Sequence, residues 1–534
     1  MTLNLSGAAT ASAATDAGGN FSFANLAIGD YVATPALTGY TFNPTSTVVS
    51  VIGANISGTN FTATANVAPT YTLSGTVTAA GTGAVLQNVL ITLSGAGSAT
   101  TLTNASGGYS FSGLTDGSYT VTPAPAGYTF SPASTTVPIS GASVVSANFT
   151  ATGIAATGRL NDTGSTANQC YQAGDSVLVA CNSVGATTLN SAQDGMVGRD
   201  ADVATNNNAD GNLGFSFTAV TGGCVQDNVT GLMWEVKTAD GGLRDWTHIY
   251  TNYDSTTTAQ KVDGTTPTQA EIDAATNSIG FKNAVNSQAL CGFSDWRLPT
   301  VDELHSIVDY GVVAPGPTVD ATWLPNTQGG PNAQGNTLGG VFWSASPYVG
   351  NSASAWVVYF NNGFVDFNGR HLNEGRNMRL VRASQSAASA QRYVISTDGT
   401  EVTDQKTGLI WRRCSEGMVF SGDPGTGNCT VTASTFTHEA ALARAQTEAA
   451  NTGIAWRLPN IKELASIADK SLSNPAIDRT VFPATPAKYF WSASPYVRDS
   501  FGSWDVSFDV GRVSSSYSDG RTIHGYVRLV RDGQ

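Results

Sequence analysis

Apolar and polar residues alternate in short runs through about the first 150 residues of the chain. The run Tyr119-Thr-Val-Thr is an example, and glycine, aspartate and proline residues separate such runs. A period of two residues between turn signals is typical of β-strands with one buried face. The spacing predicts all-β sandwich domains of the Ig-like type, with aromatic residues such as Tyr31 and Phe130 in their cores.

This region contains one β domain twice, at an offset of 88 residues. Gly39-Tyr-Thr-Phe returns as Gly127-Tyr-Thr-Phe, and Asn60-Phe-Thr-Ala-Thr returns at Asn148. We place the two domains at residues 1–66 and 70–152. The second domain begins with residues 71–88, which have no counterpart in the first, so we expect the first domain to lack a strand. Either the sequence starts upstream of Met1 or the strand comes from another subunit, since open sheet edges recruit strands.

From residue 158 the pattern changes to helices mixed with short strands, and it also occurs twice. Each Trp-Arg-Leu-Pro, at Trp296 and Trp456, is followed by a helix N-cap signature with glutamate three residues after the cap. The apolar residues that follow are spaced as on one helix face, and residues 439–450 predict an earlier helix. We expect two α+β modules, at residues 158–385 and 391–534.

The octapeptide Phe-Trp-Ser-Ala-Ser-Pro-Tyr-Val stands at 342–349 and 490–497, and both copies end in Arg-Leu-Val-Arg, at 379–382 and 528–531. Between these points the copies diverge. Trp356-Val-Val-Tyr-Phe aligns with Trp504-Asp-Val-Ser-Phe, in which the first, third and fifth positions agree and the second and fourth differ. This predicts a strand with one buried and one free face, and hence one frame that displays two different binding surfaces.

The predicted binding residues are side chains that bind through aromatic contact and adaptable hydrogen bonds. Ordinary surface drift between duplicates would leave the same pattern. In the first copy they are Asn351, Ser352, Tyr359, Asn361, Phe364, Asp366, Asn368, Arg370, His371, Asn373 and Asn377. In the second copy they are Arg498, Asp499, Phe501, Ser507, Asp509, Arg512, Ser514, Tyr517, Asp519, Arg521, His524 and Tyr526.

Charge narrows the classes of partner. The net charge is −13 over 534 residues, which argues against binding to nucleic acid or to an anionic membrane. Residues 1–157 carry only Asp16, Asp30 and Asp116 as charged side chains, a composition that suits an extracellular stalk. We expect no membrane insertion because no apolar run reaches the length of a spanning helix. No signal peptide is visible at Met1.

The six cysteines are even in number and contain no Cys-x-x-Cys pair, which favours disulfides over zinc. Pairing nearest neighbours gives three disulfides, and six reduced thiols are the alternative. The predicted pairs are Cys170–Cys181, Cys224–Cys291 and Cys414–Cys429.

We expect no catalytic residue, metal or cofactor. The histidines His248, His305, His371, His438 and His524 show no metal spacing. Residues 206–217 imitate a calcium loop, but Phe217 stands where the bidentate glutamate belongs, so a polar loop is the default. For six arginines a buried structural salt bridge is the expected role. These are Arg297, Arg457, Arg379, Arg382, Arg528 and Arg531.

Four motifs occur in the same order in both modules: Thr-Gly-Leu-(Met/Ile)-Trp, Trp-Arg-Leu-Pro, Phe-Trp-Ser-Ala-Ser and Arg-Leu-Val-Arg. This set resembles the family named for the C-terminal domain of Legionella collagen-like adhesins, which is similar to C-type-lectin-like folds and to retroelement-diversified variable proteins. Residues 1–152 resemble carboxypeptidase regulatory-like and Cna-B-like sandwiches. The reactive cysteine arrangement of the formylglycine-generating enzymes, which share a similar fold, is not recognisable.

The resemblance implies an extracellular, surface-displayed adhesive protein that binds an unknown glycan or protein and is not an enzyme. The alternative is a structural subunit of an extracellular filament. It would assemble by strand complementation, with self-association through the incomplete first β domain.

Overall fold

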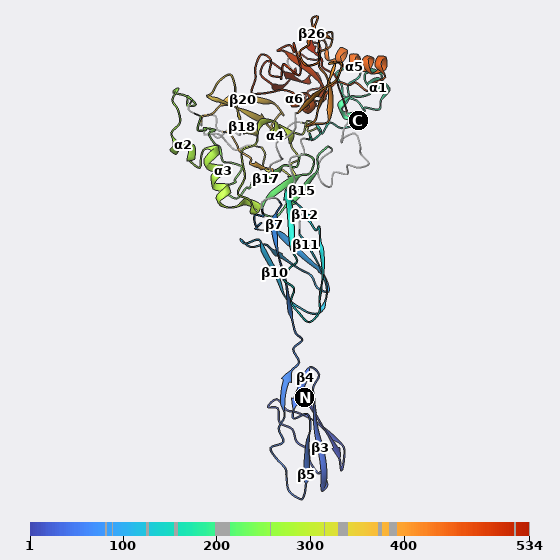
Figure 1. Cartoon of the computed structure of the whole chain (residues 1–534), viewed down its shortest axis with the longest axis vertical. Helices are drawn as coiled ribbons and strands as arrows, with labels where there is room; N and C mark the ends of the chain where they lie inside the picture. Colours follow the sequence, from blue (N-terminus) through green and yellow to red (C-terminus); the bar gives the residue numbers. More distant parts are fainter. Residues whose placement is uncertain are drawn as a thin grey trace.

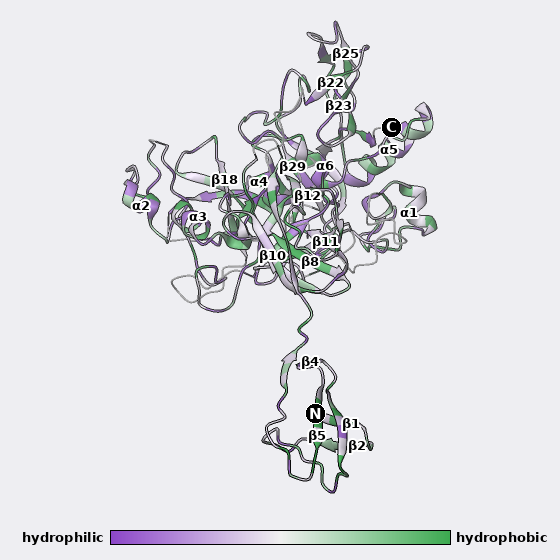
Figure 2. Cartoon of the chain, turned by 60° about the horizontal axis from the view of Figure 1, so that its bottom comes forward, coloured by the Kyte–Doolittle hydropathy of each residue, from purple (hydrophilic) through white to green (hydrophobic). Residues whose placement is uncertain are grey.

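The computed structural model describes residues 1–80, 83–87, 89–123, 128–153, 159–197, 214–256, 258–313, 316–328, 340–371, 376–383, 392–516 and 520–532. The molecule is elongated and mostly β-sheet, as expected from the strand patterns. Two β domains lie in line below a larger head (Figure 1). The first β domain stands apart from the rest of the molecule in a second view as well (Figure 2).

The second β domain is a sandwich of two four-stranded sheets, with strand orders β10-β7-β14-β12 and β13-β11-β8-β9. Inward residues of both sheets, such as Leu73, Ile91 and Phe149, form its core. Strand β7 is central in its sheet, antiparallel to β10 and parallel to β14. The strands are β7 (Tyr71–Ala79), β8 (Leu90–Gly95), β9 (Ala99–Leu102), β10 (Gly108–Leu114), β11 (Gly117–Pro123), β12 (Tyr128–Ser131), β13 (Thr135–Ile139) and β14 (Phe149–Gly153).

The first β domain repeats only part of this sandwich. Its four-stranded sheet, β2-β1-β3-β5, matches the β9-β8-β11-β13 sheet of the second domain. On the other side only the pair β4-β6 is formed, and residues 20–28, the counterpart of β10, belong to no strand. The strands are β1 (Thr2–Gly7), β2 (Ala11–Ala14), β3 (Gly29–Ala36), β4 (Tyr40–Asn43), β5 (Thr47–Val51) and β6 (Thr62–Ala65).

In the head, each module begins and ends in a small antiparallel sheet of four strands. The last strand of each sheet pairs next to the strand that carries the Thr-Gly-Leu-x-Trp motif. The first sheet contains β15 (Phe217–Val220), β16 (Cys224–Asp227), β17 (Met233–Glu235) and β21 (Val381–Arg382). The second contains β22 (Tyr393–Ile395), β23 (Glu401–Asp404), β24 (Leu409–Arg412) and β32 (Val530–Asp532), and β25 (Val419–Ser421) pairs separately with β26 (Asn428–Thr430).

A single sheet of eight strands runs through both modules in the order β18-β19-β20-β30-β29-β28-β31-β27. The modules meet where β20 pairs with β30, at Val365 and Val513. The strands from the first module are β18 (Val341–Pro347), β19 (Ser354–Tyr359) and β20 (Val365–Gly369). Those from the second are β27 (Thr435–Phe436), β28 (Tyr489–Pro495), β29 (Ser503–Ser507), β30 (Arg512–Ser515) and β31 (Gly525–Tyr526).

The helices cover this sheet. Both predicted N-caps are complete capping boxes, Thr300 with Glu303 and Asn460 with Glu463, and the two helices that they begin, α4 and α6, contact each other. The helix predicted at 439–450 is α5. The helices are α1 (Val184–Leu189), α2 (Gln269–Asp273), α3 (Ser278–Ser287), α4 (Val301–Ser306), α5 (His438–Thr452) and α6 (Ile461–Ser466), with 3-10 turns at Asp194–Met196 and Leu290–Gly292.

The two modules share one hydrophobic core. It contains Trp234 and Trp356 from the first module together with Trp411 and Trp504 from the second. The segment before the first module (residues 159–197, here the lead-in) also enters the head. The Nζ atom of Lys462 on α6 donates to the carbonyl oxygens of Asp162 in the lead-in, at 2.6 Å, and of Ser306 on α4, at 2.9 Å. The head is therefore one folded unit rather than two separate domains.

Three disulfides fasten the head, and all three predicted pairs are confirmed: Cys170–Cys181, Cys224–Cys291 and Cys414–Cys429. None of the helices in the described ranges has the length and apolarity that crossing a membrane requires.

Candidate functional site

The predicted binding residues do not form one continuous free face. Their strands β19 and β29 are buried on both sides. The shared core contains Trp356 and Trp504, and a separate core of the first module covers the other face of β19. Val357 is 0 % exposed, and its counterpart Asp505 is 3 % exposed. The prediction that the second and fourth positions of these strands are free was therefore wrong at Val357, Asp505 and Ser507, while Tyr359 is half-buried.

Several of the divergent residues join the two modules to each other. The Nε atom of Arg512 lies 2.7 Å from Oδ1 of Asp366, and its guanidinium lies over the ring of Phe367. The Phe364 ring packs against Trp504 at a centroid distance of 5.4 Å. The Nη1 atom of Arg498 donates to the carbonyl oxygen of Asn361. These side chains contact the other module. We therefore assign them to the contact surface between the two modules, which we call the junction.

Other predicted residues stabilise their own hairpins. Asn368 donates to the hydroxyl of Tyr359, Ser514 donates to Asp505, and Ser507 donates to Asp509. The remaining predictions divide by exposure and by description. Five residues are exposed: Asn351, Ser352, Asp499, Phe501 and His524. Two are half-buried, His371 and Tyr526, and four are buried, Arg370, Asn377, Ser507 and Arg521. Outside the described residues lie Asn373, Tyr517, Asp519 and the calcium-like loop from 206 to 212.

Arg370 and Arg521 occupy the same structural position in the two modules. The backbone N–H of Arg370 donates to Ala353 and that of Arg521 to Phe501, at 2.9 and 3.1 Å. The carbonyl of each arginine then accepts the backbone N–H of Asn252 or His438. Phe501 of the second module is therefore the structural counterpart of Ala353 in the first module.

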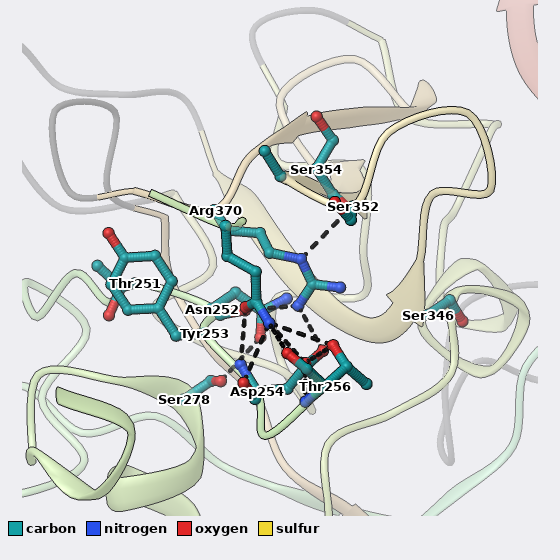
Figure 3. Close-up of polar contacts among 12 residues, drawn as sticks. Thr251, Asn252, Tyr253, Asp254, Thr256, Ser278, Ser346, Ser352, Ser354 and Arg370 are labelled. Atoms are coloured by element: carbon teal, nitrogen blue, oxygen red, sulfur yellow. Dashed lines mark hydrogen bonds and ion pairs between the residues drawn. The ribbon is translucent and has the colours of Figure 1, made fainter. Parts of the chain in front are cut away.

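In the first module this position is filled. The Nη1 atom of Arg370 donates to Oδ2 of Asp254 at 2.8 Å and to the carbonyl of Asn252 at 2.7 Å. Figure 3 shows the guanidinium between these residues and the segment that carries Ser352 and Ser354, and its Nε donates to the carbonyl oxygen of Ser354. The long connection between Asn252 and α3, which includes α2, supplies the enclosing loop. The side chain of Arg370 is 3 % exposed.

In the second module the same position is open. Here β27 runs directly into α5, so no enclosing loop exists, and the lead-in packs beside the arginine instead. A cavity of about 740 Å³ remains between the lead-in, α5 and the divergent hairpin. We call it the Phe501 pocket. Its lining residues are Ala173, Gly174, Asp175, Ser176, Thr188, Leu189, Thr437, Glu439, Ala440, Ala443, Phe501, Arg521 and Thr522.

Arg521 is held firmly at the base of this pocket. Its guanidinium lies 3.8 Å from the ring centroid of Tyr171, and Nη1 donates to the carbonyl oxygen of Asp175 at 2.9 Å. Its Nε lies 3.3 Å from Nδ1 of His438. Burial, together with the positive charge of Arg521, lowers the pKa of His438 to about 3, so this histidine is neutral at physiological pH. Arg521 orders the three segments that form the pocket.

Two carboxylates, of Asp175 and Glu439, and the aromatic ring of Phe501 line the pocket and can contact a ligand. The backbone N–H of Val177, helped by the side chain of Gln172, lowers the pKa of Asp175, which is therefore ionised at neutral pH. One carboxylate oxygen of Glu439 already accepts the N–H of Gly174 at 2.9 Å. The side chain of Phe501 is 50 % exposed. An apolar ring beside hydrogen-bond acceptors suits a ligand with hydroxyl or amide donors and an apolar face.

Sequence reasoning found Phe501 and Arg521 but missed Tyr171, Asp175 and Glu439. The disulfide prediction at Cys170 and Cys181 was the one available sign that the lead-in has a fixed shape.

A second cavity, of about 610 Å³, lies between α4 and α6, and none of the predicted binding residues lines it. Three charged side chains in its wall form ion pairs. Lys470 bonds Asp302 across the junction at 2.6 Å, and Glu303 is bonded to Arg297. It belongs to the junction and does not use the divergent hairpins.

Four of the six arginines form ion pairs, and of these four only the Arg457–Glu463 pair is buried on both sides, as predicted. Arg297 pairs with Glu303 and Arg457 with Glu463, and the two remaining pairs are Arg382–Asp295 and Arg531–Glu401. Arg379 and Arg528 differ: both are 0 % exposed, and their recorded bonds go to carbonyl and hydroxyl oxygens. The salt-bridge prediction was wrong for these two. Within the described residues no group of histidine, cysteine and carboxylate side chains has the arrangement that a metal ion needs.

Comparison with known proteins agrees with this division of the chain. Residues 72–152 match the carboxypeptidase regulatory-like domain. A chitinase, ChiA, of Flavobacterium johnsoniae is 42 % identical over 125 residues, which are 22 % of this chain and 7 % of the chitinase. The chain therefore spans only a small part of the length of that relative.

Three solved structures share partial similarity with this chain. The Bacillus anthracis TIE protein is 18 % identical, covers 29 % of this chain and 30 % of its own, and has a TM-score of 0.18. A minor pilin of Streptococcus agalactiae is 15 % identical, with coverages of 29 and 82 % and a TM-score of 0.15. A shaft pilin of Lactobacillus rhamnosus GG is 12 % identical, with coverages of 28 and 87 % and a TM-score of 0.17.

The head gives the most extensive match. Residues 223–382 and residues 400–531 each match the Lcl C-terminal domain, and the two matches together span more than half of the chain. The protein belongs to the Lcl C-terminal domain family and carries two copies of that domain.

Proposed function

We propose that this protein is an extracellular adhesive protein whose head binds a ligand at the Phe501 pocket, while the two β domains act as a stalk. The observation that carries the proposal is the contrast at one structural position. The first module closes the space around Arg370 with its own loop, whereas the second leaves a cavity of about 740 Å³ beside Arg521. C-type-lectin-like architecture of the modules is part of this proposal.

The chemistry of the pocket favours a glycan. A sugar ring presents an apolar C–H face that packs on an aromatic ring, and its hydroxyl groups donate to carboxylates. The exposed ring of Phe501 and the carboxylates of Asp175 and Glu439 supply both kinds of contact in the same cavity. A protein ligand that inserts a polar side chain is the alternative outcome of the test below.

An extracellular location is supported by the chemistry of the chain. All six cysteines are paired in disulfides, which persist in oxidising compartments. We propose binding without a chemical step. His438, the histidine beside Arg521, has its pKa lowered to about 3 and therefore accepts no proton at neutral pH.

The test is a binding screen of the full chain against arrayed glycans and extracellular-matrix proteins, followed by one matched pair of variants. Phe501→Ala removes an aromatic ring that is 50 % exposed in the pocket, and Tyr489→Ala removes one that is 51 % exposed on β28, outside it. We expect Phe501→Ala to weaken binding at least about tenfold, which corresponds to about 1.4 kcal/mol, and Tyr489→Ala to leave it unchanged. Equal binding by Phe501→Ala and the unchanged chain would contradict the proposal.

A second candidate function is that of a structural subunit of an extracellular filament. The favouring observation is the incomplete sandwich of the first β domain. Electron microscopy of native protein released from cells distinguishes the two candidates, because regular filaments support the second and discrete rods support the first.

A further inference from the structure

The two modules are related by an approximate twofold axis, so a surface of one module has a counterpart on the other. Val365 pairs with its counterpart Val513, and α4 contacts α6. Residues of these helices and of the loops that follow them correspond at an offset of 160 residues. The cavity of about 610 Å³ between the helices, which we call the α4–α6 cavity, includes the beginning of α4 and the loop after α6. The counterpart site consists of the beginning of α6 and the loop after α4.

A segment of the chain itself fills the counterpart site. The Nζ atom of Lys462, at the beginning of α6, donates to the carbonyl oxygen of Asp162 in the lead-in at 2.6 Å. In the loop after α4, the backbone N–H of Tyr310 donates to the carbonyl oxygen of Thr163 at 2.7 Å. Both lead-in residues are buried. The counterpart site therefore holds a polypeptide segment by two consecutive carbonyl oxygens.

The α4–α6 cavity has the same two kinds of donor but is open. Lys470 corresponds to Tyr310, and Asp302 corresponds to Lys462. Among the described residues no oxygen accepts the backbone N–H of Lys470, although this residue is only 6 % exposed. Its Nζ atom lies 2.6 Å from Oδ1 of Asp302, so an ammonium group again stands beside the first turn of a helix.

Other groups in the wall of the cavity add to its chemistry. Lys406 lines the cavity and is exposed, whereas its counterpart Val229 is apolar and buried. Pro347 and Val349 of the repeated octapeptide form an apolar part of the wall, and Val349 is 49 % exposed. A positive charge beside a short apolar surface suits a segment with one acidic side chain and small neighbours.

We propose that the α4–α6 cavity binds a polypeptide segment of a partner protein, with the chemistry that the lead-in has at the counterpart site. Consecutive carbonyl oxygens of the segment accept the backbone N–H and the Nζ of Lys470, and an acidic side chain contacts Lys406. The neighbouring side chains are small, as in Asp162-Thr-Gly-Ser of the lead-in. None of the residues that line this cavity lines the Phe501 pocket, so the proposal is independent of the function proposed for that pocket.

The physical reason is that a buried backbone N–H group in a folded protein almost always has an acceptor. In the open cavity only water is available to the N–H of Lys470. A peptide carbonyl replaces that water, as the carbonyl of Thr163 does at Tyr310. These hydrogen bonds fix the register of the segment, while the charge of Lys406 discriminates between segments.

The experiment adds a fluorescent peptide with the sequence of residues 160–166 to the full chain and follows its anisotropy. The matched control peptide carries Asp162→Lys. We expect saturable binding of the first peptide and at least about tenfold weaker binding of the second, because the reversed charge is placed beside Lys406 and Lys470. Absence of saturable binding, or equal binding of the two peptides, would overturn the proposal.

Two matched pairs of variants place the peptide on the chain. Val349→Trp fills part of the cavity and should abolish binding, whereas Val419→Trp, on an exposed residue of β25, should not. Lys406→Glu should weaken binding at least about tenfold, and Lys488→Glu, at an exposed lysine outside the cavity, should leave it unchanged. Equal binding by each variant and its control would show that the peptide lies elsewhere and would contradict the assignment.

Hydrogen exchange of the unchanged chain locates the peptide without any variant. Increased protection of residues 346–349 and 468–471 supports the proposal. Protection changes confined to residues 309–311 and 460–463 would show exchange with the lead-in at the counterpart site and overturn it.

The variants also separate the α4–α6 cavity from the Phe501 pocket. Phe501→Ala should leave binding of the peptide unchanged, and Val349→Trp should leave binding at the Phe501 pocket unchanged. A glycan whose binding is lost in Val349→Trp, together with no binding of the peptide, would assign the cavity to a sugar and overturn the proposal.

Discussion

The two head modules have the same frame but use their divergent hairpins differently. At one structural position the first module places Ala353 and an enclosed Arg370, and the second places an exposed Phe501 and Arg521 beside a cavity. The difference arises from the preceding connection, which is long in the first module and absent in the second. The enclosed and the open position therefore differ by the presence of this connection.

The contact between the modules has approximate twofold character, since Val365 and its counterpart Val513 face each other. Arg512 of the second module meets Asp366 of the first. The symmetry-related positions are Phe364 and Ser514, and Phe364 instead packs on Trp504. The two copies became different at the seam that joins them, so part of the divergence belongs to the pairing of modules and not to a ligand.

The shared core predicts that neither module unfolds alone. Trp504→Ala removes a buried side chain that Tyr310 of the first module contacts at a centroid distance of 4.6 Å. Large-to-small substitutions of buried tryptophan cost about 3–5 kcal/mol. We expect Trp504→Ala and its counterpart Trp356→Ala to lower the melting temperature of the whole head in calorimetry. A variant in which one half of the head melts early and the other half is unchanged would contradict the single core.

An arginine–glutamate ion pair occurs in both modules and tests how burial changes the contribution of a pair to stability, because it is more buried in the second module than in the first. The side chains of Arg457 and Glu463 are 7 % and 11 % exposed, against 41 % and 21 % for Arg297 and Glu303. Removing one partner of a buried pair costs about 3 kcal/mol or more, whereas an exposed pair contributes less than about 1 kcal/mol.

We therefore expect Glu463→Gln to lower the free energy of unfolding in denaturant by about 3 kcal/mol and Glu303→Gln by less than about 1 kcal/mol. Glutamine keeps an oxygen acceptor for the helix N-cap, so the two variants compare the charge alone. Equal losses in both copies would show that burial is not what separates them.

Asp505 stands where the first module has Val357, and its effect on stability depends on pH. Burial raises the pKa of Asp505 to about 7, with the hydroxyl of Ser514 opposing the rise. The folded chain therefore holds a proton that the unfolded chain releases near pH 4. Stability falls as pH increases between these values, because the folded state binds more protons there.

Asp505→Asn should remove this loss, and we expect it to stabilise the head by about 4 kcal/mol at pH 8 and to have little effect below pH 4. Chemical denaturation across this pH range measures the difference, with Asp499→Asn as an exposed control on the same hairpin. An unchanged pH dependence in Asp505→Asn would remove this residue as its source.

Signals from residues that are close together in the sequence were sufficient to predict much of the fold. A capping box needs only residues within one turn, so Thr300 with Glu303 and Asn460 with Glu463 were predicted correctly. The disulfides join neighbours along the chain, and the pairing at Cys170, Cys224 and Cys414 followed from order alone. The repeats were visible because duplicated domains retain their buried aromatic residues.

The site was predicted only in part. Alternation at Trp356 and Trp504 correctly indicated strands, but a strand in the middle of an eight-stranded sheet between two cores is covered on both faces. Polar side chains such as Asp505 and Ser507 are compatible with such burial once they find hydrogen-bond partners. Residue type alone therefore could not separate binding side chains from those at the junction.

By itself the sequence determined the repeats, the helix starts, the disulfides and the family, because each depends on neighbouring residues or on repetition. Only the tertiary structure decided that the modules share a core and that Arg512 forms an ion pair with Asp366. It also decided that Asp175 and Glu439 line the same pocket as Phe501. These contacts join residues that are more than a hundred positions apart along the chain or lie in different modules. They exist because apolar surface is buried only when the two modules and the lead-in fold against one another.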